Sequence, residues 1–193
     1  ILFKPRGTVC TNFDPEGRRR AIDLVDHPTG VRLYPVGRLD QETSGLLLLT
    51  NDGELSNQLT HPRFGVHKKY HVTVDGALDE DEVRKLERGV FLSDRRQSSG
   101  KKRGRKSKSN LTLLHSGRDR SVLLMELTEG RNRQVRRMML YVGHKVRKLR
   151  RVQMGPIKLK GLKPGQWRDL EEKEVEALRR AVRGSQRVRV RGR

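Results

Sequence analysis

The segment formed by residues 37–45 carries the carboxylates best placed for chemistry. Its sequence, GRLDQETSG, puts Asp40 and Glu42 between two apolar segments, so a loop on the rim of a sheet would hold them. A hydrolase that uses two carboxylates needs them on separate sides of the bond it breaks, which fits poorly with two acids so close along one loop. A structural role for Asp40, as a turn or cap residue, is at least as well supported by the spacing alone.

Arg136 is the second candidate, in the sequence NRQVRRMML. A helix capped by Asn132 and ended by Gly143 would form one apolar stripe from Val135, Met138, Met139 and Val142. Arg136 then lies at about 100° from Val135, beside the stripe, where its guanidinium would be partly buried and would need a partner. We expect that partner to be Asp40, while Arg133 and Arg137 point to solvent or phosphate. The alternative is that Arg136 extends to solvent.

Other chemistries find little support in the sequence. His61, His67 and His71 lack an accompanying cysteine or acid cluster, so no metal is expected. Ser44 lies outside a nucleophile-elbow pattern, and no phosphate-binding glycine loop is present. Cys10, the single cysteine, excludes a disulfide framework. The longest apolar run, residues 46–49, is far shorter than the about 20 residues of a membrane span.

The charge of the chain indicates its partner. The 193 residues carry a net charge of +21, all of it in residues 97–193, because acids and bases balance in residues 1–96. Leu, Ile, Val and Phe make up about a quarter of the chain, enough to bury a core in one domain. Nucleic acid is the natural partner of such a charge, whereas a membrane-binding amphipathic helix is missing. The alternative is a solubilising surface or basic tail, for which segments 101–108 and 187–193 are suited.

The elements that must position these residues alternate between short strands and helices. We expect strands on both sides of the 37–45 loop, at residues 31–36 and 46–50, and a half-buried strand around Tyr70, Val72 and Val74. Further elements follow from caps, turns and periodicity: helices at 54–59, 79–88 and 171–182, and strands at 111–115, 122–128 and 146–152. Residues 93–109 are basic and rich in Gly and Ser, which predicts a mobile insertion. The fold class is α+β, with a mixed, mostly antiparallel sheet flanked by helices.

Several ordered motifs resemble those of the RsuA family of pseudouridine synthases. They are FKPRG, YPVGRLDQETSGLLLLTNDGEL, KKYHVTV, EGRNRQVRRM and LRRVQMG, spread over roughly residues 1–170. The resemblance implies the pseudouridine synthase fold and the conversion of a uridine in RNA to pseudouridine. In that reaction the N-glycosidic bond is broken and the base is reattached through its carbon 5. One carboxylate then suffices, since no water is activated.

The resemblance also assigns roles to residues. Asp40 corresponds to the catalytic aspartate, which acts as a nucleophile at C1′ of the sugar or as a base in a glycal route. Tyr70 corresponds to the tyrosine that stacks on the target base, and Arg136 to the arginine that pairs with the aspartate. Arg38 would hold the flipped-out nucleotide or its vacated place. We expect these further residues to bind RNA: Lys68, Lys69, Arg131, Arg133 and Arg137. No cofactor is implied.

The expected organisation is a catalytic domain over residues 1–183 and a disordered basic tail over residues 184–193. Ile1 lies inside the first strand motif of the family, so we expect the N-terminal S4-type domain of many members to be absent from this chain. The expected substrate is ribosomal RNA of the large subunit, acted on by a monomer in the bacterial cytoplasm, or in an organelle if the chain is a trimmed precursor. The alternative is a non-catalytic RNA-binding or ribosome-assembly factor.

Overall fold

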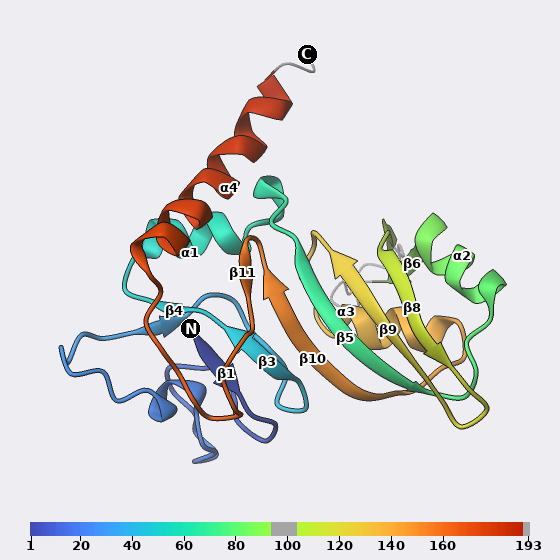
Figure 1. Ribbon diagram of the computed structural model, residues 1–193, viewed down its shortest axis with the longest axis horizontal. Helices are drawn as coiled ribbons and strands as arrows, with labels where there is room; N and C mark the ends of the chain where they lie inside the picture. Colours follow the sequence, from blue (N-terminus) through green and yellow to red (C-terminus); the bar gives the residue numbers. More distant parts are fainter. Residues whose placement is uncertain (94–103, 191–193) are drawn as a thin grey trace.

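A single mixed sheet organises the protein, and the computed structural model describes residues 1–93 and 104–190 (Figure 1). Six strands lie in the order β1-β3-β10-β5-β9-β8, with β11 paired to β10. Every pairing is antiparallel except that of β10 with β3. The strands are β1 (Leu2–Lys4), β3 (Ser44–Leu47), β5 (Lys68–Asp75), β8 (Asn110–Ser116), β9 (Arg120–Leu127), β10 (Val146–Met154) and β11 (Ile157–Lys158). The expected fold class, α+β with a mostly antiparallel sheet, is confirmed.

Helix α3 (Gln134–Tyr141) covers one face of this sheet and closes the main core. Its buried residues Val135, Met138 and Met139 pack in one cluster with residues of β5 and β9, including Val72 and Met125. The predicted apolar stripe of the helix is therefore confirmed, as is its end at Gly143, whose φ is +91°. The predicted cap is wrong. Arg133, in the left-handed conformation, is the N-cap, and no side chain caps the helix.

Two further helices begin at N-cap residues that accept hydrogen bonds from the first turn of the helix. Asp52 caps α1 (Gly53–Thr60) by accepting a hydrogen bond from the Leu55 backbone N–H. Asp79 and Glu82 form a capping box at the start of α2 (Glu80–Arg88). Short elements complete this part of the chain: η1 (Ala21–Leu24), β2 (Tyr34–Pro35), β4 (Leu49–Thr50) and η2 (Pro62–Phe64). The expected strand at 31–36 is thus reduced to two residues, and the expected strand at 46–50 divides at Leu48 between two sheets.

The basic segments are more ordered than their composition predicts. Strands β6 (Val90–Ser93) and β7 (Gly104–Ser107) form an antiparallel ribbon, so the expected mobile insertion at 93–109 is wrong at its ends; residues 94–103 lie outside the described residues. Helix α4 (Glu172–Val190) replaces the expected disordered tail over 184–190, and residues 191–193 lie outside the description. The early part of α4 is anchored because Leu178 and Val182 are buried against α1, η2 and their neighbours.

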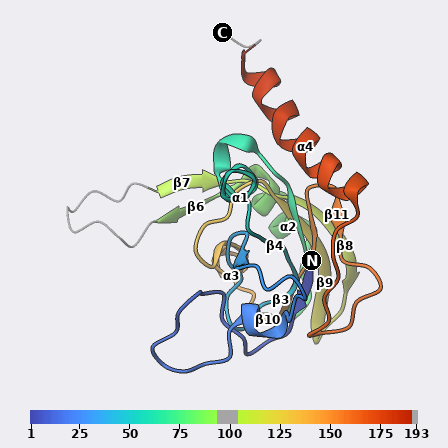
Figure 2. The same ribbon diagram turned by 90° about the vertical axis from the view of Figure 1, so that its left-hand side faces the viewer.

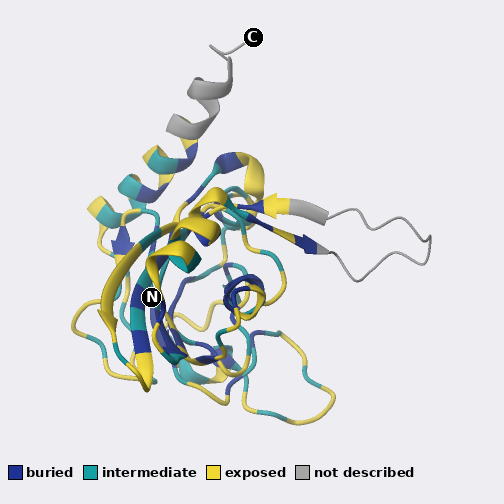
Figure 3. Ribbon diagram, turned by 90° about the vertical axis from the view of Figure 1, so that its right-hand side faces the viewer, coloured by how far each residue is buried: buried dark blue, intermediate teal, exposed yellow. Residues whose placement is uncertain are grey.

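Two parts of the chain project from the α3 side of the sheet. Figure 2 shows the β6–β7 ribbon and the segment between β1 and η1 extending in the same direction. Figure 3 shows that this segment consists mostly of exposed and intermediate residues, whereas buried residues are concentrated along the strands. None of the helices in the described part of the chain combines the length and apolar character needed to cross a bilayer.

Candidate active site

The loop of residues 37–43, called the Asp40 loop below, connects β2 to β3 at the α3 side of the sheet. Its end is fixed by Gly45, which has a φ of +111° and pairs with Arg151 of β10. A Cβ atom at position 45 would lie 2.2 Å from the carbonyl oxygen of Arg151. Only glycine permits this close approach, and the loop therefore leaves the sheet at a defined point.

The backbone of the Asp40 loop is held at every carbonyl from residue 40 to residue 43. The Asp40 oxygen accepts from the Thr43 N–H at 2.9 Å, and the Gln41 oxygen accepts from the Gly7 N–H at 2.9 Å. The Glu42 oxygen accepts from Arg136 at 3.3 Å. The Thr43 oxygen accepts from the Lys4 Nζ at 2.9 Å. With these bonds made, the backbone cannot move Asp40 without losing partners for polar groups.

Lys4 contributes most to this arrangement, because its side chain lies entirely inside the protein. Its Nζ donates to the carbonyls of Pro5 and Thr43 at 2.9 Å each and to that of Gln41 at 3.5 Å. The residue is 0% exposed, and burial lowers the pKa of the ammonium group. Lys4 therefore joins strand β1 to Gln41 and Thr43, the loop residues that follow Asp40, through main-chain oxygens.

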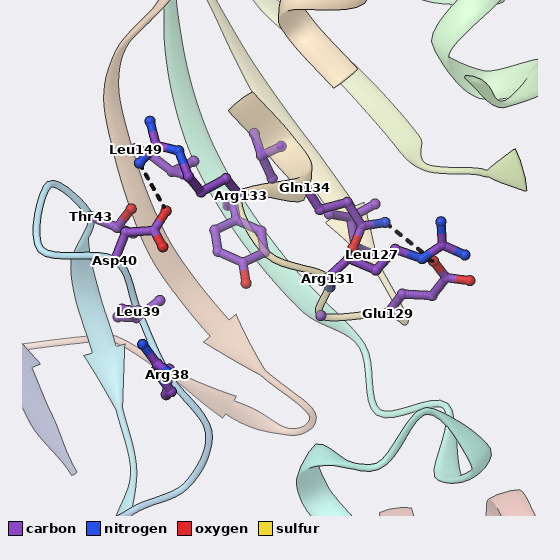
Figure 4. Close-up of a pocket in the computed structure, with 13 residues that line it drawn as sticks. Arg38, Leu39, Asp40, Thr43, Leu127, Glu129, Arg131, Arg133, Gln134 and Leu149 are labelled. Carbon is purple, nitrogen blue, oxygen red and sulfur yellow. Dashed lines mark hydrogen bonds and ion pairs between the residues drawn. The ribbon is translucent and has the colours of Figure 1, made fainter. Parts of the chain in front are cut away.

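A small pocket lies between the Asp40 loop, β5 and the start of α3 (Figure 4). Asp40 and Tyr70 both line it, beside the apolar side chains of Leu127, Val135 and Leu149. The Asp40 carboxylate is 29% exposed, so it is accessible to a molecule in the pocket. An aromatic ring, an apolar wall and a carboxylate together suit a planar polar group such as a nucleobase.

Arg133 is the guanidinium nearest to that carboxylate. Its Nη1 lies 3.7 Å from Oδ2 of Asp40, the ion pair drawn in Figure 4. Among the described residues, Arg133 is the one residue other than glycine that has a positive φ, which is 48°. Such a conformation is strained in a residue with a Cβ atom and is frequent at functional sites. It turns Arg133 away from the helical path and toward the Asp40 loop.

Arg136 takes a different position from the one predicted. Its Nη1 donates to the Val146 carbonyl at 3.2 Å and its Nη2 to the Glu42 carbonyl at 3.3 Å. The guanidinium is half-buried, as the helical spacing predicted, and burial lowers its pKa while the nearby Asp40 and Glu42 act in the opposite direction. The predicted ion pair with Asp40 is wrong. Helix α3 begins after Arg133, and its first turn directs Arg136 to the main-chain carbonyls of Val146 and Glu42 instead of to the Asp40 carboxylate.

The family model of RNA pseudouridylate synthase matches residues 1–141. The chain belongs to this RNA pseudouridylate synthase family. A ribosomal large subunit pseudouridine synthase B of Bacillus subtilis is 42% identical over 179 residues, which cover 93% of this chain and 70% of that protein. The protein of the same name from Yersinia pestis is 43% identical over 183 residues, 93% of this chain and 54% of the relative.

A solved structure agrees with these family relationships. A crystal structure of a pseudouridylate synthase superimposes with a TM-score of 0.78 at 32% identity, covering 92% of this chain and 71% of that one. The pseudouridine synthase fold expected from the motifs is thereby confirmed. The chain spans between about half and about two thirds of the length of the relatives it matches.

The positions of the residues expected to bind RNA differ widely. Arg38 is exposed beside Asp40, and within the described residues its guanidinium has no protein partner. The prediction that Lys68 binds RNA is wrong, because Lys68 is 6% exposed and its Nζ donates to the Val66 carbonyl. Lys69 pairs with Glu126 at 3.1 Å, and Arg131 pairs with Glu129 at 3.1 Å.

The remaining two residues lie at the start of α3. Arg137 is half-buried, and its N–H donates to the Arg133 carbonyl in the first turn. Arg133 is exposed at the pocket rim, but it faces a carboxylate and not solvent alone. Of the six residues expected to bind RNA, the two that are exposed, Arg38 and Arg133, thus both lie beside Asp40.

Sequence reasoning missed Lys4, and it gave Glu42 no catalytic role. A lysine at the end of the apolar run ILFK was a signal that its side chain is buried and needs main-chain partners. Glu42 is exposed and pairs with Arg6 at 2.6 Å, which lowers the pKa of its carboxyl. The two acids of the loop therefore have separate surroundings. In the described ranges, no three His, Cys, Asp or Glu side chains gather as a metal ion would require.

Proposed function

We propose that this protein converts a uridine of ribosomal RNA to pseudouridine, with Asp40 as its catalytic residue. The observation that carries the proposal is the accessible Asp40 carboxylate in one pocket with the ring of Tyr70, on a backbone held at four consecutive carbonyls. The large-subunit RNA is the favoured substrate, because relatives at 42–43% identity carry that substrate in their names.

The reaction explains the residue types at the pocket. The target uridine leaves its stack, at a cost of a few kcal/mol, and its base is received between Tyr70 and the apolar wall. Asp40 either attacks C1′ of the ribose as the N1–C1′ bond breaks, or removes a sugar proton to form a glycal. The base then turns and C5 bonds to C1′. In the nucleophilic route the Asp40–C1′ bond breaks as this bond forms, and in the glycal route Asp40 returns the sugar proton. C5 finally loses its proton and N1 gains one. Substrate and product have the same atoms.

The neighbouring cations would position the substrate and the loop. Arg38 and Arg133 line the pocket rim, where guanidinium groups suit the phosphates on either side of an extruded nucleotide. Arg136 acts on the loop instead, by holding the Glu42 carbonyl, two residues after Asp40. Of these three arginines, Arg133 is the one that pairs with a carboxylate, so binding of RNA through Arg133 would compete with its ion pair to Asp40.

The direct test replaces Asp40 by Asn and follows pseudouridine formation in unmodified large-subunit rRNA transcripts. Asp40→Asn should abolish turnover while RNA affinity stays within about threefold, since one exposed charge is neutralised. Asp81→Asn is the matched control, because Asp81 is also paired with an arginine, Arg84 at 2.8 Å, but lies on α2. Retained turnover in Asp40→Asn would refute the catalytic role. RNA binding without pseudouridine at any site in wild-type protein would favour a non-catalytic RNA-binding factor.

A further inference from the structure

Phe13 is an aromatic side chain left in solvent by a well-anchored segment. It is 76% exposed and belongs to the segment between β1 and η1, which extends in the same direction as the β6–β7 ribbon (Figure 2). The Asp14 carboxylate, only 4% exposed, accepts from the backbone and guanidinium of Arg18 at 2.7 and 2.6 Å. Thr11 Oγ1 donates to the Phe13 carbonyl at 2.6 Å. The ring is therefore presented to solvent by a structured backbone.

The exposed Phe13 lies in the same pocket as Asp40. Phe13 is one of the residues that line an open pocket of about 370 Å³, which also reaches Arg18, Arg38, Arg133 and Asp40. Four residues, Arg38, Leu39, Asp40 and Arg133, belong both to this cavity and to the pocket of Tyr70. Two compartments thus meet at the carboxylate, one with Tyr70 and one with Phe13, and arginines lie at their junction.

This arrangement matches two consecutive nucleotides of an RNA strand. If the target base occupies the Tyr70 pocket, the chain continues past the arginines into the second compartment, where Phe13 offers a flat apolar surface. An extruded uridine leaves its neighbour without a stacking partner, and aromatic side chains replace such partners irrespective of base identity. An isolated exposed phenylalanine would need no explanation. A phenylalanine that lines a pocket reaching the Asp40 carboxylate does need an explanation.

We propose that Phe13 is a substrate-binding residue that stacks on the nucleotide next to the target uridine. The proposal rests on the proposed function, since it takes the Tyr70 pocket as the place of the target base. It adds a second base-binding position, formed by the segment between β1 and η1, and assigns Arg38 and Arg133 to the phosphate that joins the two nucleotides.

The test compares Phe13→Ala, Phe13→Tyr and wild type in steady-state kinetics on an unmodified large-subunit rRNA transcript. Phe13→Ala should raise KM about tenfold, because one stacked base is lost, and leave kcat within about twofold. Phe13→Tyr should restore KM to within about twofold of wild type. Tyr141→Ala removes another exposed aromatic ring, at the far end of α3, and should leave KM unchanged.

A spectroscopic measurement separates stacking from a general loss of binding. Once the modified uridine is mapped, a short rRNA fragment is made with 2-aminopurine at each neighbouring position. Wild type and Phe13→Tyr should quench its fluorescence at one of the two positions, and Phe13→Ala should not. An unchanged KM in Phe13→Ala, equal quenching by Phe13→Ala, or equal KM increases in Phe13→Ala and Tyr141→Ala would each overturn the proposal. Absence of pseudouridine with wild-type protein would instead refute the proposed function itself.

Discussion

Replacing Lys4 by Met isolates the contribution of one buried ammonium group to the geometry of Asp40. Methionine has a similar length and fills a similar apolar space, so the core around β1 stays filled. The substitution removes the hydrogen bonds from Nζ to the carbonyls of Pro5, Gln41 and Thr43. Two of these acceptors, Gln41 and Thr43, belong to the Asp40 loop, which therefore loses its main attachment to β1.

The expected effects on stability and activity differ in size. Two short bonds from a charged donor contribute about 3–6 kcal/mol together. The offset is the cost of keeping an ammonium group out of water, several kcal/mol per ion, a cost that also appears as the lowered pKa of Lys4. The net loss of unfolding free energy should be about 0–2 kcal/mol. A shift of about 1 Å in the Asp40 carboxylate, by contrast, lowers kcat about 100-fold.

The assay measures kcat for pseudouridine formation together with urea unfolding. Lys68→Met is the matched control, since Lys68 is also a buried lysine of the sheet but its Nζ donates to the Val66 carbonyl, away from the Asp40 loop. Lys68→Met should keep kcat within about threefold of wild type. Equal losses of kcat in both variants, or wild-type kcat in Lys4→Met, would show that Lys4 does not position Asp40.

Two further predictions concern the pKa of buried Lys68 and the backbone strain at Arg133. Burial lowers the pKa of Lys68 from 10.5 to about 8, and the unfolded chain keeps its proton up to the higher value. The charged ammonium group therefore destabilises the folded state most below pH 8. Between pH 8 and 10.5 the unfolding free energy of wild type should rise by up to about 3 kcal/mol relative to that of Lys68→Met, as measured by urea titrations. A difference that stays constant with pH would contradict this. Arg133→Gly should keep or raise the unfolding free energy by up to about 1 kcal/mol, because a φ of 48° suits glycine, yet lower kcat/KM at least tenfold. A destabilised but fully active Arg133→Gly would disprove the functional origin of the strain.

Elements with strong local signals could be predicted from the sequence. Helix α2 carries acids in its first turn, an Asp79 cap and Gly89 after its end, and β5 alternates between apolar and polar residues. The division at Leu48 and the β6–β7 ribbon could not be predicted in this way. Both depend on pairing with distant strands, whereas composition reports only local preference. Helix α4 was underestimated because its charge suggests disorder, while burial of Leu178 and Val182 stabilises it.

The sequence predicted which residues form the site better than it predicted the contacts between them. Asp40 and Tyr70 do line one pocket, and the phase of α3 correctly placed Arg136 at the edge of the core. The contact of Asp40 could not be read from that phase. A helical wheel assumes helical backbone at Arg133, but the structure has a left-handed residue there, which redirects one arginine to the carboxylate and leaves the other to the backbone.

Three buried cations revise what the net charge of +21 means. Lys4, Lys68 and Arg151 are almost completely buried, and each donates to main-chain carbonyls. Carbonyl oxygens stabilise a buried cation without placing a second carboxylate near Asp40, so positive charge can fix the backbone while Asp40 stays accessible from the pocket. Part of the basic character of the chain is therefore structural. Arg38 and Arg133, by contrast, are exposed guanidinium groups that line both cavities where these meet at the Asp40 carboxylate, a position that suits them to bind phosphate.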